Sequence, residues 1–466
     1  MMFSVARTQT RALALPRLRA AARGRWGFRS MAALQQLAPA ARPEDDTDPA
    51  FVRPLGSVEE MFAAYGEIGS ISYSMAARVR GELNRDRLEA GIDVFQRSNE
   101  HLSLTIRTGS NGRRYFARSP QRIPLRVVDL AATSWEEVME NELTAPFPED
   151  GTLVRVTALL GRDGEHILLP TFHHSLADGL SAITILKDLL LATSGRQPAL
   201  AGHGIADTLE DTLGPAFQET LTTMASMPPP PFPPPRNRWA FHRDRNPAVQ
   251  GRALTAPATQ RLVRRARAEG TTVYAALVAA LARARYERRG AGTYPEAPDG
   301  LRLLVPFNSR AYAPPPTSAV GLFIGAFVLT LPPPRLPTPD VFWAQARESG
   351  TLVHAQKGRR SALGLAGAAA LQMAHDASPQ AVMQFMRVAT DHEALLTNMG
   401  VLDVPKVCGG FEVQEVWAAG FKTCIEGEDN VAVGTFGGRL SLVHSSLEGT
   451  EGLLDGMLKV LEESCE

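Results

Sequence analysis

The sequence has little of what marks membrane spans, disulfide-rich folds and polyanion binders. Its three cysteines, Cys408, Cys424 and Cys465, show no short metal-ligand or redox spacing, so we expect free thiols and no bound metal. Lys plus Arg equal Asp plus Glu at 49 each, which leaves no net charge to attract nucleic acid or anionic lipid. The longest apolar run, 320–331, is broken by glycines and is shorter than the roughly 20 residues that span a bilayer. We therefore expect no nucleic-acid partner and no transmembrane segment.

Acidic residues are missing from the N-terminal stretch. None precedes Glu44, while arginines recur among Ala, Leu, Ser and Thr, a composition typical of an organellar transit peptide. The alternative is a protein that starts at Met31, behind a disordered or misassigned stretch. We therefore predict that 1–45 is a disordered or transit-peptide-like extension. The protein would be cytoplasmic, or mitochondrial or plastid-targeted if the extension is a transit peptide.

Proline is concentrated in the middle of the chain. Seven of the ten residues 227–236 are proline, and such a segment adopts the extended polyproline conformation rather than helix or central strand. We favour a linker over a ligand for proline-recognising modules. The predicted organisation is an N-terminal lobe over 46–225, a Pro-rich linker over 226–250 and a C-terminal lobe over 251–466.

Strand-like and helix-like apolar patterns alternate in both lobes. A strand over 71–80 precedes a helix capped by Asn84, and Pro170 weakens the prediction of a strand just before the histidine pair at 173–174, because proline cannot donate to a sheet ladder. The other predicted strands are 102–106, 115–116, 125–128, 153–160, 166–172, 301–305, 322–331, 410–417, 431–436 and 440–444. Helices are predicted over 183–190, 260–269 and 274–286. This alternation indicates an α/β sandwich arrangement.

The chemistry concentrates in the run His173-His174-Ser175-Leu176-Ala177-Asp178-Gly179, at a strand-to-helix junction. His174 is suited to take a proton from a hydroxyl or amine at neutral pH. Asp178 either caps the following helix or holds the loop by pairing with a distant cation. Gly179 permits an unusual backbone conformation or a close approach. Alternatives are a hydrogen-bonded structural histidine and, less favoured, a metal site of His173, His174 and Asp178.

This run resembles the HHxxxDG signature of the acyltransferase superfamily that contains chloramphenicol acetyltransferase, peptide-synthetase condensation domains, plant BAHD acyltransferases and alcohol acetyltransferases. Further segments look like the alcohol acetyltransferases and the phthiocerol/phthiodiolone dimycocerosyl transferases, and the similarity spans about residues 50–460. These segments are 53–62, 80–83, 146–156, 272–273, 305–310 and 397–400. The BAHD Asp-Phe-Gly-Trp-Gly motif has no counterpart. The resemblance implies two chloramphenicol acetyltransferase-like α/β sandwich lobes with an active-site channel between them.

The resemblance also implies roles for individual residues. His174 corresponds to the general base, supported by His173 and Gly179. Asp178 corresponds to an aspartate in a structural salt bridge, and Arg310 is its expected partner, although Asn308-Ser309 stand where the family has Asp-Leu. Thr397 and Asn398 lie in a segment matching the family's Ser-Asn-x-Gly run and are candidates for the channel or the oxyanion site. No metal is implied.

The function implied is transfer of an acyl group from an acyl-CoA, or a carrier-bound phosphopantetheine thioester, to an alcohol. The thioester would be a co-substrate, and we expect no permanently bound cofactor. The expected partners of a monomer are a small-molecule donor, an alcohol or amine acceptor and, in one version, an acyl carrier protein. Two alternatives stay open: an amide-forming condensation enzyme with carrier-bound donors, and a non-catalytic acyl-carrier-binding module. We interpret His354, His392 and His444 as structural, and the pair Phe342-Trp343 as core.

Overall fold

The computed structural model describes residues 48–199, 204–226, 241–289, 300–313, 319–334 and 338–466. The predicted extension over 1–45 lies outside these residues, and so does 227–240, which is most of the predicted linker. Strand β8 (Ala248–Ala253) begins inside the range predicted as linker.

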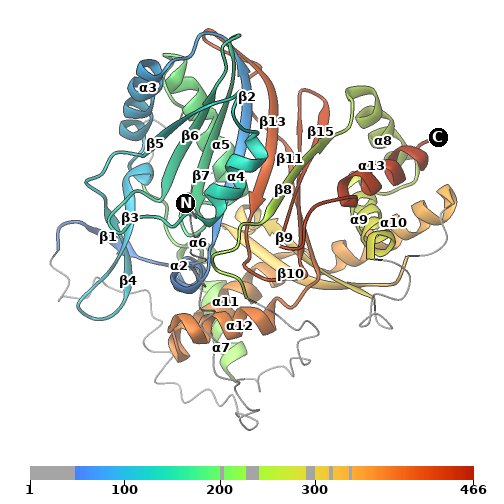
Figure 1. The fold of residues 1–466 in the computed structure, drawn as a ribbon. Helices are drawn as coiled ribbons and strands as arrows, with labels where there is room; N and C mark the ends of the chain where they lie inside the picture. Colours follow the sequence, from blue (N-terminus) through green and yellow to red (C-terminus); the bar gives the residue numbers. More distant parts are fainter. Residues whose placement is uncertain (1–47, 200–203, 227–240, 290–299, 314–318, 335–337) are drawn as a thin grey trace, which may run out of the picture.

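The described residues form two six-stranded sheets and one three-stranded sheet, with helices around them (Figure 1). The first sheet has the order β12-β13-β2-β7-β6-β5 and is antiparallel except between β5 and β6. Its strands are β12 (Val407–Cys408), β13 (Phe411–Phe421), β2 (Ser72–Arg80), β7 (Glu165–His173), β6 (Val154–Leu160) and β5 (Leu125–Asp129). The small sheet, β1-β4-β3, consists of β1 (Phe51–Pro54), β4 (Arg114–Arg118) and β3 (Leu104–Thr108).

The second large sheet has the order β10-β9-β11-β14-β15-β8. Its central strand β11 runs parallel to both neighbours, and the other pairs are antiparallel. Its strands besides β8 are β10 (Ile324–Leu331), β9 (Leu301–Asn308), β11 (Ala394–Val401), β14 (Asp429–Phe436) and β15 (Arg439–Ser446). The predicted α/β architecture is confirmed.

Each large sheet buries an apolar face under helices. The first sheet shares a core with α3 (Arg85–Ser98) and α5 (Gly179–Thr193), and Asn84 caps α3 as predicted. The second shares a core with α8 (Ala256–Ala268), α9 (Val273–Arg289), α10 (Pro339–Gln356) and α13 (Leu453–Glu463). Trp343 is fully buried there, and its indole N–H donates to the Ser464 carbonyl at 2.7 Å. The prediction of Phe342-Trp343 as core is confirmed.

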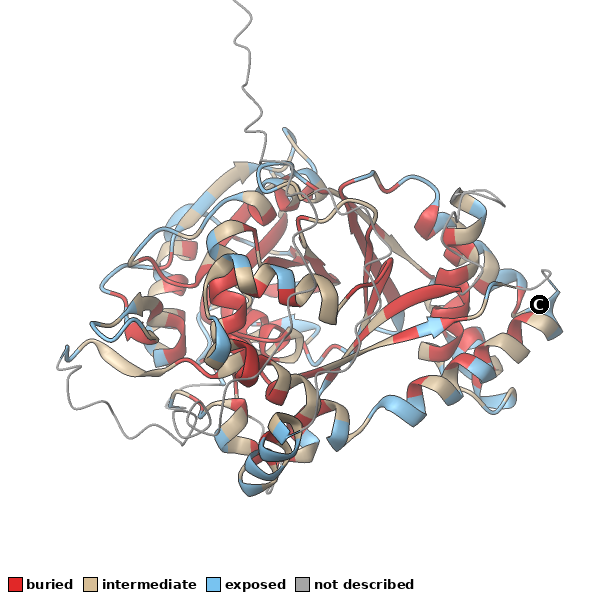
Figure 2. Ribbon diagram, turned by 90° about the horizontal axis from the view of Figure 1, so that it is seen from below, coloured by how far each residue is buried: buried red, intermediate tan, exposed pale blue. Residues whose placement is uncertain are grey.

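A third group of helices lies below the two sheets in Figure 1. It has its own apolar core and consists of α2 (Ser57–Ile68), α6 (Leu209–Leu213), α7 (Pro215–Ser226), α11 (Arg359–His375) and α12 (Pro379–Ala389). Helix α4 (Trp135–Thr144) packs on β8 and on the first sheet, where Trp135 stacks on Trp417 with ring centroids 5.1 Å apart. Buried residues gather on the inward-facing sides of all these elements (Figure 2). None of the described helices is both long and apolar enough to cross a membrane.

Strand β13 links the two halves of the chain. The sequence predicts a strand near 410–417, and one is present, but it pairs with β2 of the first sheet rather than with the strands that follow it. It also packs against β14 and β15 of the second sheet. The first sheet is therefore built from both halves of the sequence, and its strand β13 packs against the second sheet.

Pro170 lies within β7, which is a central strand between β2 and β6. It is paired with Val156 of β6, but on the β2 side the paired residues skip it, from Ser74 with Thr171 to Ala77 with Leu168. The missing N–H thus interrupts one ladder without ending the strand.

Candidate active site

The histidine motif occupies the turn between β7 and α5, as the sequence predicts. Strand β7 ends at His173 and α5 begins at Gly179. The turn is tied to the first sheet by the N–H of His174, which donates to the Ile71 carbonyl at 3.0 Å. A strand end next to a helix start places the motif at the C-terminal end of β7, a central strand of the first sheet.

His174 is held between two aromatic rings. Its ring centroid lies 4.7 Å from that of Phe62 in α2 and 4.8 Å from that of Tyr73 in β2. Tyr73 is itself fixed, because its hydroxyl donates to the carbonyls of Ala177 at 2.9 Å and Asp178 at 3.2 Å. Burial lowers the pKa of His174 below its ordinary value, and its own carbonyl, the charge of Asp178 and the Ala177 carbonyl oppose this shift. The imidazole is therefore neutral at neutral pH and has a fixed orientation.

His173 faces away from His174, as expected for neighbours on a strand. Its Nδ1 accepts the N–H of Ser175 at 3.2 Å, and its ring meets Phe147 edge-on at 5.7 Å. Burial is the main cause that lowers the pKa of His173, to about 3. His173 is therefore a neutral side chain that stabilises the turn.

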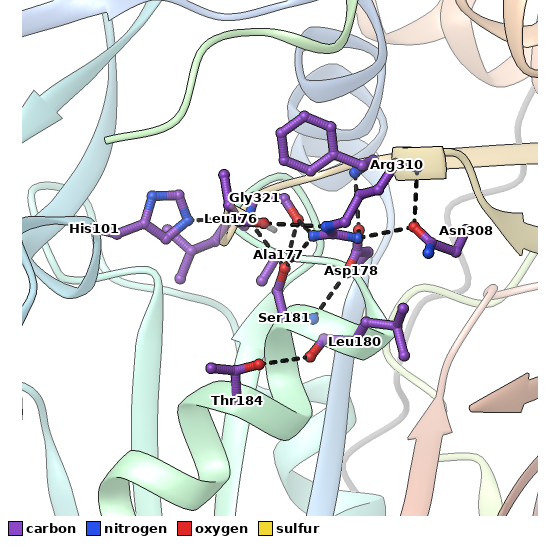
Figure 3. Close-up of polar contacts among 12 residues, drawn as sticks. His101, Leu176, Ala177, Asp178, Leu180, Ser181, Thr184, Asn308, Arg310 and Gly321 are labelled. Atoms are coloured by element: carbon purple, nitrogen blue, oxygen red, sulfur yellow. Dashed lines mark hydrogen bonds and ion pairs between the residues drawn. The ribbon is translucent and has the colours of Figure 1, made fainter. Parts of the chain in front are cut away.

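The carboxylate of Asp178 does both things that the sequence left as alternatives (Figure 3). One oxygen accepts the Ser181 N–H at 2.9 Å and caps α5. The other accepts from Arg310 Nη1 at 2.6 Å and from the Phe323 N–H at 2.9 Å. Asp178 therefore points away from the imidazole of His174 and joins the motif to the second half of the chain.

Arg310 has a complete set of partners. Its Nη2 donates to the Ser181 hydroxyl at 2.7 Å and its Nε to the Ala319 carbonyl at 3.1 Å. Asn308, which stands where the resemblance implies an aspartate, accepts from the Arg310 N–H at 3.1 Å and from Nη1 at 3.3 Å. The departure at Asn308 therefore preserves an acceptor for the arginine, and the contact of Arg310 with Asp178 is present.

Gly179 is the first residue of α5, and its backbone lies outside the left-handed region. The expectation of an unusual backbone conformation is therefore wrong, because Asp178 already makes the turn and Gly179 is helical. The expectation of close approach fits: a Cβ on Gly179 would lie 3.3 Å from Cε of Met399. Because Gly179 has no side chain, the cavity wall does not protrude at this position.

Thr397 and Asn398 point to opposite sides of β11. Thr397 lines the cavity described below, as do Leu395 and Met399 on the same face of the strand. Asn398 is exposed, does not line the cavity, and accepts the Gly400 N–H with its Oδ1 at 2.9 Å. The expectation that Asn398 lines the channel or the oxyanion site is therefore wrong, because successive side chains of a strand face opposite ways.

A cavity of about 240 Å³ lies between the two large sheets, with His174 and Gly179 in its wall. Alternate residues of β9, β10, β11 and β13 line it, together with the start of β2 and side chains of α2, α11 and α12. Most of the lining is apolar. The strand residues that face it are Ser72, Tyr73, Leu304, Pro306, Ile324, Ala326, Leu395, Thr397, Met399, Ala419 and Phe421. The arrangement suits a substrate with an apolar body whose reacting atom meets His174.

Several supporting residues carry no local sequence signal for their role. Ser175 donates its hydroxyl to the Glu59 carbonyl at 2.8 Å, and the Glu59 carboxylate pairs with Arg53 at 2.7 Å. His101 Nε2 lies 2.6 Å from the Leu176 carbonyl (Figure 3). The segment 53–62, which stands out in the sequence only for its family resemblance, thus holds the motif in place through Glu59. Phe62, the last residue of this segment, contacts His174.

The described part of the chain contains no group of three or more His, Cys, Asp or Glu side chains able to hold a metal ion. His173 and His174 face different sides of the turn, and Asp178 is engaged by Arg310. The site residues thus offer hydrogen bonds and a neutral imidazole.

Comparison with known proteins supports the fold over nearly the whole chain. The TRI3 trichothecene 15-O-acetyltransferase of Fusarium sporotrichioides has a TM-score of 0.63 at 11% identity, covering 89% of this chain and 94% of its own. The first condensation domain of the CDA synthetase has a TM-score of 0.62 at 16% identity, covering 89% and 97%. Polyketide synthase associated protein 5 of Mycobacterium tuberculosis has a TM-score of 0.58 at 15% identity, covering 90% and 98%.

Sequence similarity covers a smaller part. No profile of a known protein family matches the chain. Malpinin synthetase of Mortierella alpina is 29% identical over 146 residues, which is 29% of this chain and 2% of the synthetase. The hybrid PKS-NRPS synthetase LUC5 of a Fusarium species is 30% identical over 178 residues, or 34% and 4%. The chain thus spans a small part of the length of these relatives. The predicted fold and the resemblance to the superfamily of condensation domains and acetyltransferases are confirmed.

Proposed function

We propose that the protein transfers an acyl group from a thioester to an alcohol, with His174 as the general base and acyl-CoA as the donor. The observation that carries the proposal is the position of His174: a neutral imidazole, held between Phe62 and Tyr73, in the wall of an apolar cavity between the two sheets. Such a group can accept a proton only from a molecule that enters the cavity.

The proposed reaction needs no covalent enzyme intermediate. The imidazole of His174 takes the proton of the acceptor hydroxyl while the hydroxyl oxygen attacks the carbonyl carbon of the thioester. The C–O bond forms, the C–S bond breaks, and the thiolate takes the proton back from the imidazolium, giving an ester and a free thiol. Thr397, in the same cavity wall, is the candidate donor to the oxyanion.

The second candidate is an amide-forming condensation with a carrier-bound donor. It is favoured by the similarity to peptide synthetases over about a third of the chain. The chemistry at His174 would be the same, with an amine in place of the alcohol. A third reading, a module that binds acyl carriers without turnover, predicts binding and no released thiol.

A thiol-release assay tests these readings. Short-, medium- and long-chain acyl-CoAs, and the same acyl groups on a phosphopantetheinylated carrier protein, are each combined with a panel of alcohols and amines. We expect turnover with acyl-CoA and an alcohol, and a loss of about 100- to 10,000-fold in His174→Ala. The matched control is His354→Ala, which replaces an exposed histidine of α10 and should leave turnover unchanged.

The other outcomes separate the alternatives. Turnover only with the carrier-bound donor and an amine would establish the condensation reading in place of ours. Full activity in His174→Ala would overturn the assignment of the base. Carrier binding without thiol release from any combination would favour the non-catalytic module.

A further inference from the structure

Three strands of the second sheet, β9, β10 and β11, run along the cavity away from the histidine motif. At the motif end, Met399 of β11 lies next to Gly179. Arg310, just after β9, pairs with Asp178, and the N–H of Phe323, just before β10, donates to the same carboxylate. The cavity-facing residues of these strands therefore lie at increasing distances from the motif.

The strand register groups these residues into three successive rows. Leu304 is paired with Leu395, and Pro306, two residues nearer the motif, is paired with Ala326. All of the residues in the rows are apolar except Thr397. From the motif outward, the rows are Ile324 and Met399, then Pro306, Ala326 and Thr397, then Leu304 and Leu395.

The end of the cavity away from the motif is closed by buried polar side chains that already have partners. Glu428, just before β14, and His392 line it, with Nε2 of His392 3.6 Å from Oε1 of Glu428. The Thr423 side chain forms a hydrogen bond with the same carboxylate. At this end of the sheet, Arg302 of β9 also pairs with Glu393 at 2.9 Å. A hydrocarbon chain that reached this layer would contact polar groups instead of apolar ones, so it would gain little by extending further.

The length and the volume of the apolar part of the cavity indicate the same size of ligand. Leu395 and Met399 are four residues apart on β11, about 13 Å at the usual rise along a strand. A fully extended chain advances about 1.2 Å per bond, so about ten or eleven bonds span this distance. The cavity volume is about 240 Å³, compared with about 150 Å³ for a dry apolar cavity that holds the six carbons of benzene. About ten carbons therefore fill the cavity by either measure.

The helices contribute an adaptable part of the cavity wall. It includes Met61 of α2 and both Met383 and Met386 of α12. Methionine side chains are unbranched and flexible, so they adjust to the shape of a bound group, whereas the rows on the strands are fixed by the sheet. The cavity should therefore discriminate between chain lengths more strongly than between a saturated and an unsaturated chain.

We propose that the cavity selects an unbranched apolar chain of about eight to ten carbons, which lies along β11 with its reacting end at the motif and its other end at Leu304 and Leu395. This inference rests on the proposed function for the position of the reacting end, and it names the substrate class of that site. The chain belongs either to the acyl donor or to the acceptor alcohol, since either can present its reacting end to His174.

Two series of substrates test the length limit. In the donor arm, straight-chain acyl-CoAs from acetyl to palmitoyl are combined with ethanol, and in the acceptor arm, straight-chain alcohols from ethanol to dodecanol are combined with acetyl-CoA. In one arm we expect kcat/KM to rise about fourfold per added methylene, up to about eight to ten carbons. It should then fall at least about tenfold toward the longest chain. In both arms, a flat profile, a maximum at short chains or a rise that continues to the longest chain would overturn the proposal.

A block in the middle row should shorten the preferred chain. Ala326→Phe places a ring about halfway along the apolar stretch, so the maximum of kcat/KM should move to chains of about four to six carbons. The matched control is Thr330→Phe, which adds the same ring at an exposed position of β10 outside the cavity. Its length profile should equal that of the unmodified protein. An unmoved maximum in Ala326→Phe would overturn the proposal.

Removing a side chain from the row farthest from the motif should lengthen the preferred chain. Leu304→Ala leaves room for about two or three further carbons, so the maximum should move to longer chains. Leu303→Ala removes the same atoms from the opposite face of β9, where Leu303 is fully buried in the core beneath the helices. This control should lower Tm without moving the maximum. An unmoved maximum in Leu304→Ala, or an equal shift in both variants, would overturn the proposal.

Binding without turnover separates this inference from the proposed function. In His174→Ala, the acyl-CoAs or the alcohols of the same series should raise Tm most at the chain length preferred in turnover. If the unmodified protein consumes no thioester but this dependence on length persists, the proposed reaction fails and the chain-binding site stands. Turnover with no dependence on chain length in either measurement would leave the reaction standing and overturn the inference.

Discussion

Asp178 and Arg310, 132 residues apart in the chain, form a buried ion pair with an O–N distance of 2.6 Å. The pair does not touch the imidazole of His174. It joins the turn that carries the histidine to the second sheet, because Arg310 lies in the short 3-10 helix (Arg310–Tyr312) just after β9. Because Asp178 also caps α5, one carboxylate fixes the direction of the turn that carries His174 and its distance from the opposite wall of the cavity.

Removing one partner of the Asp178–Arg310 ion pair should lower the free energy of unfolding by much more than the ion pair itself contributes to it. In Arg310→Ala the buried Asp178 charge keeps its backbone N–H donors but loses its cation, and we expect a loss of about 3 to 5 kcal/mol in the free energy of unfolding. Arg310→Lys restores the charge without the contacts to Ser181 and Asn308, so its loss should be smaller. Urea unfolding measures both. Equal stability of Arg310→Ala and the unmodified protein would show that the pair does not hold the halves together.

The pH dependence of turnover should report the shifted pKa of His174. Its folded-state pKa lies below the ordinary value of 6.5, so the base stays neutral as the pH falls through that value. We expect kcat/KM to remain level down to about pH 6.5 and to decline only at lower pH. The measurement is thiol release at saturating donor, with circular dichroism at each pH to exclude unfolding. An acid limb centred above 6.5 would contradict the assignment of His174 as a buried base.

Much of the site follows from the sequence because it is local or belongs to a recognisable motif. The junction between strand and helix and the capping carboxylate lie within the run from His173 to Gly179, and the pairing with Arg310 is an expectation from the resemblance. The pairing of β13 with β2 does not, since the apolar pattern predicts a strand without identifying its neighbour. The placement of Asn398 shows a signal that was available: adjacent residues of a strand face opposite sides, so Thr397 and Asn398 could not both line one cavity.

Other site residues are brought together only by tertiary structure. Glu59 reaches the motif from α2 and His101 from the turn after α3, and no spacing in the sequence links them to it. The sequence predicts a structural role for His392, and the structure places this residue in the cavity wall beside Glu428. A lone polar residue at a strand start has no pattern that distinguishes a ligand contact from an ordinary buried partner.

Gly179 should limit the size of the substrate. Its backbone is helical, so Gly179→Ala introduces no backbone strain and should leave the unfolding free energy unchanged or raise it by up to about 1 kcal/mol. The new methyl group would lie 3.3 Å from Cε of Met399, which narrows the cavity beside His174. We expect the KM of Gly179→Ala for a bulky substrate to be higher than that of the unmodified protein. Gly179→Val should raise KM further, and Met399→Ala combined with Gly179→Ala should restore it; an unaltered KM in Gly179→Val would place the substrate elsewhere.

His101 should make the motif turn sensitive to acid. It is 1% exposed, and its Nε2 bonds the Leu176 carbonyl, which requires a proton on that nitrogen. Burial lowers its pKa to about 4, so the folded protein holds it neutral while the unfolded chain takes up a proton near pH 6.5. Its contribution to stability is thus complete above the unfolded-state pKa and is lost as the pH falls from about 6.5 to about 4, a change of roughly 3 kcal/mol.

His101→Gln tests this dependence because glutamine keeps an N–H donor but does not titrate. Between about pH 6.5 and about pH 4, the unfolding free energy of the variant should fall less steeply with decreasing pH than that of the unmodified protein. The difference between the two slopes should approach the value for one proton taken up on unfolding. His173 and His444, whose pKa values burial lowers to about 3, contribute the same acid sensitivity to both proteins and cancel in the comparison. Parallel pH profiles for the two proteins would mean that the imidazole of His101 is protonated in the fold, and that its bond to Leu176 survives acidification.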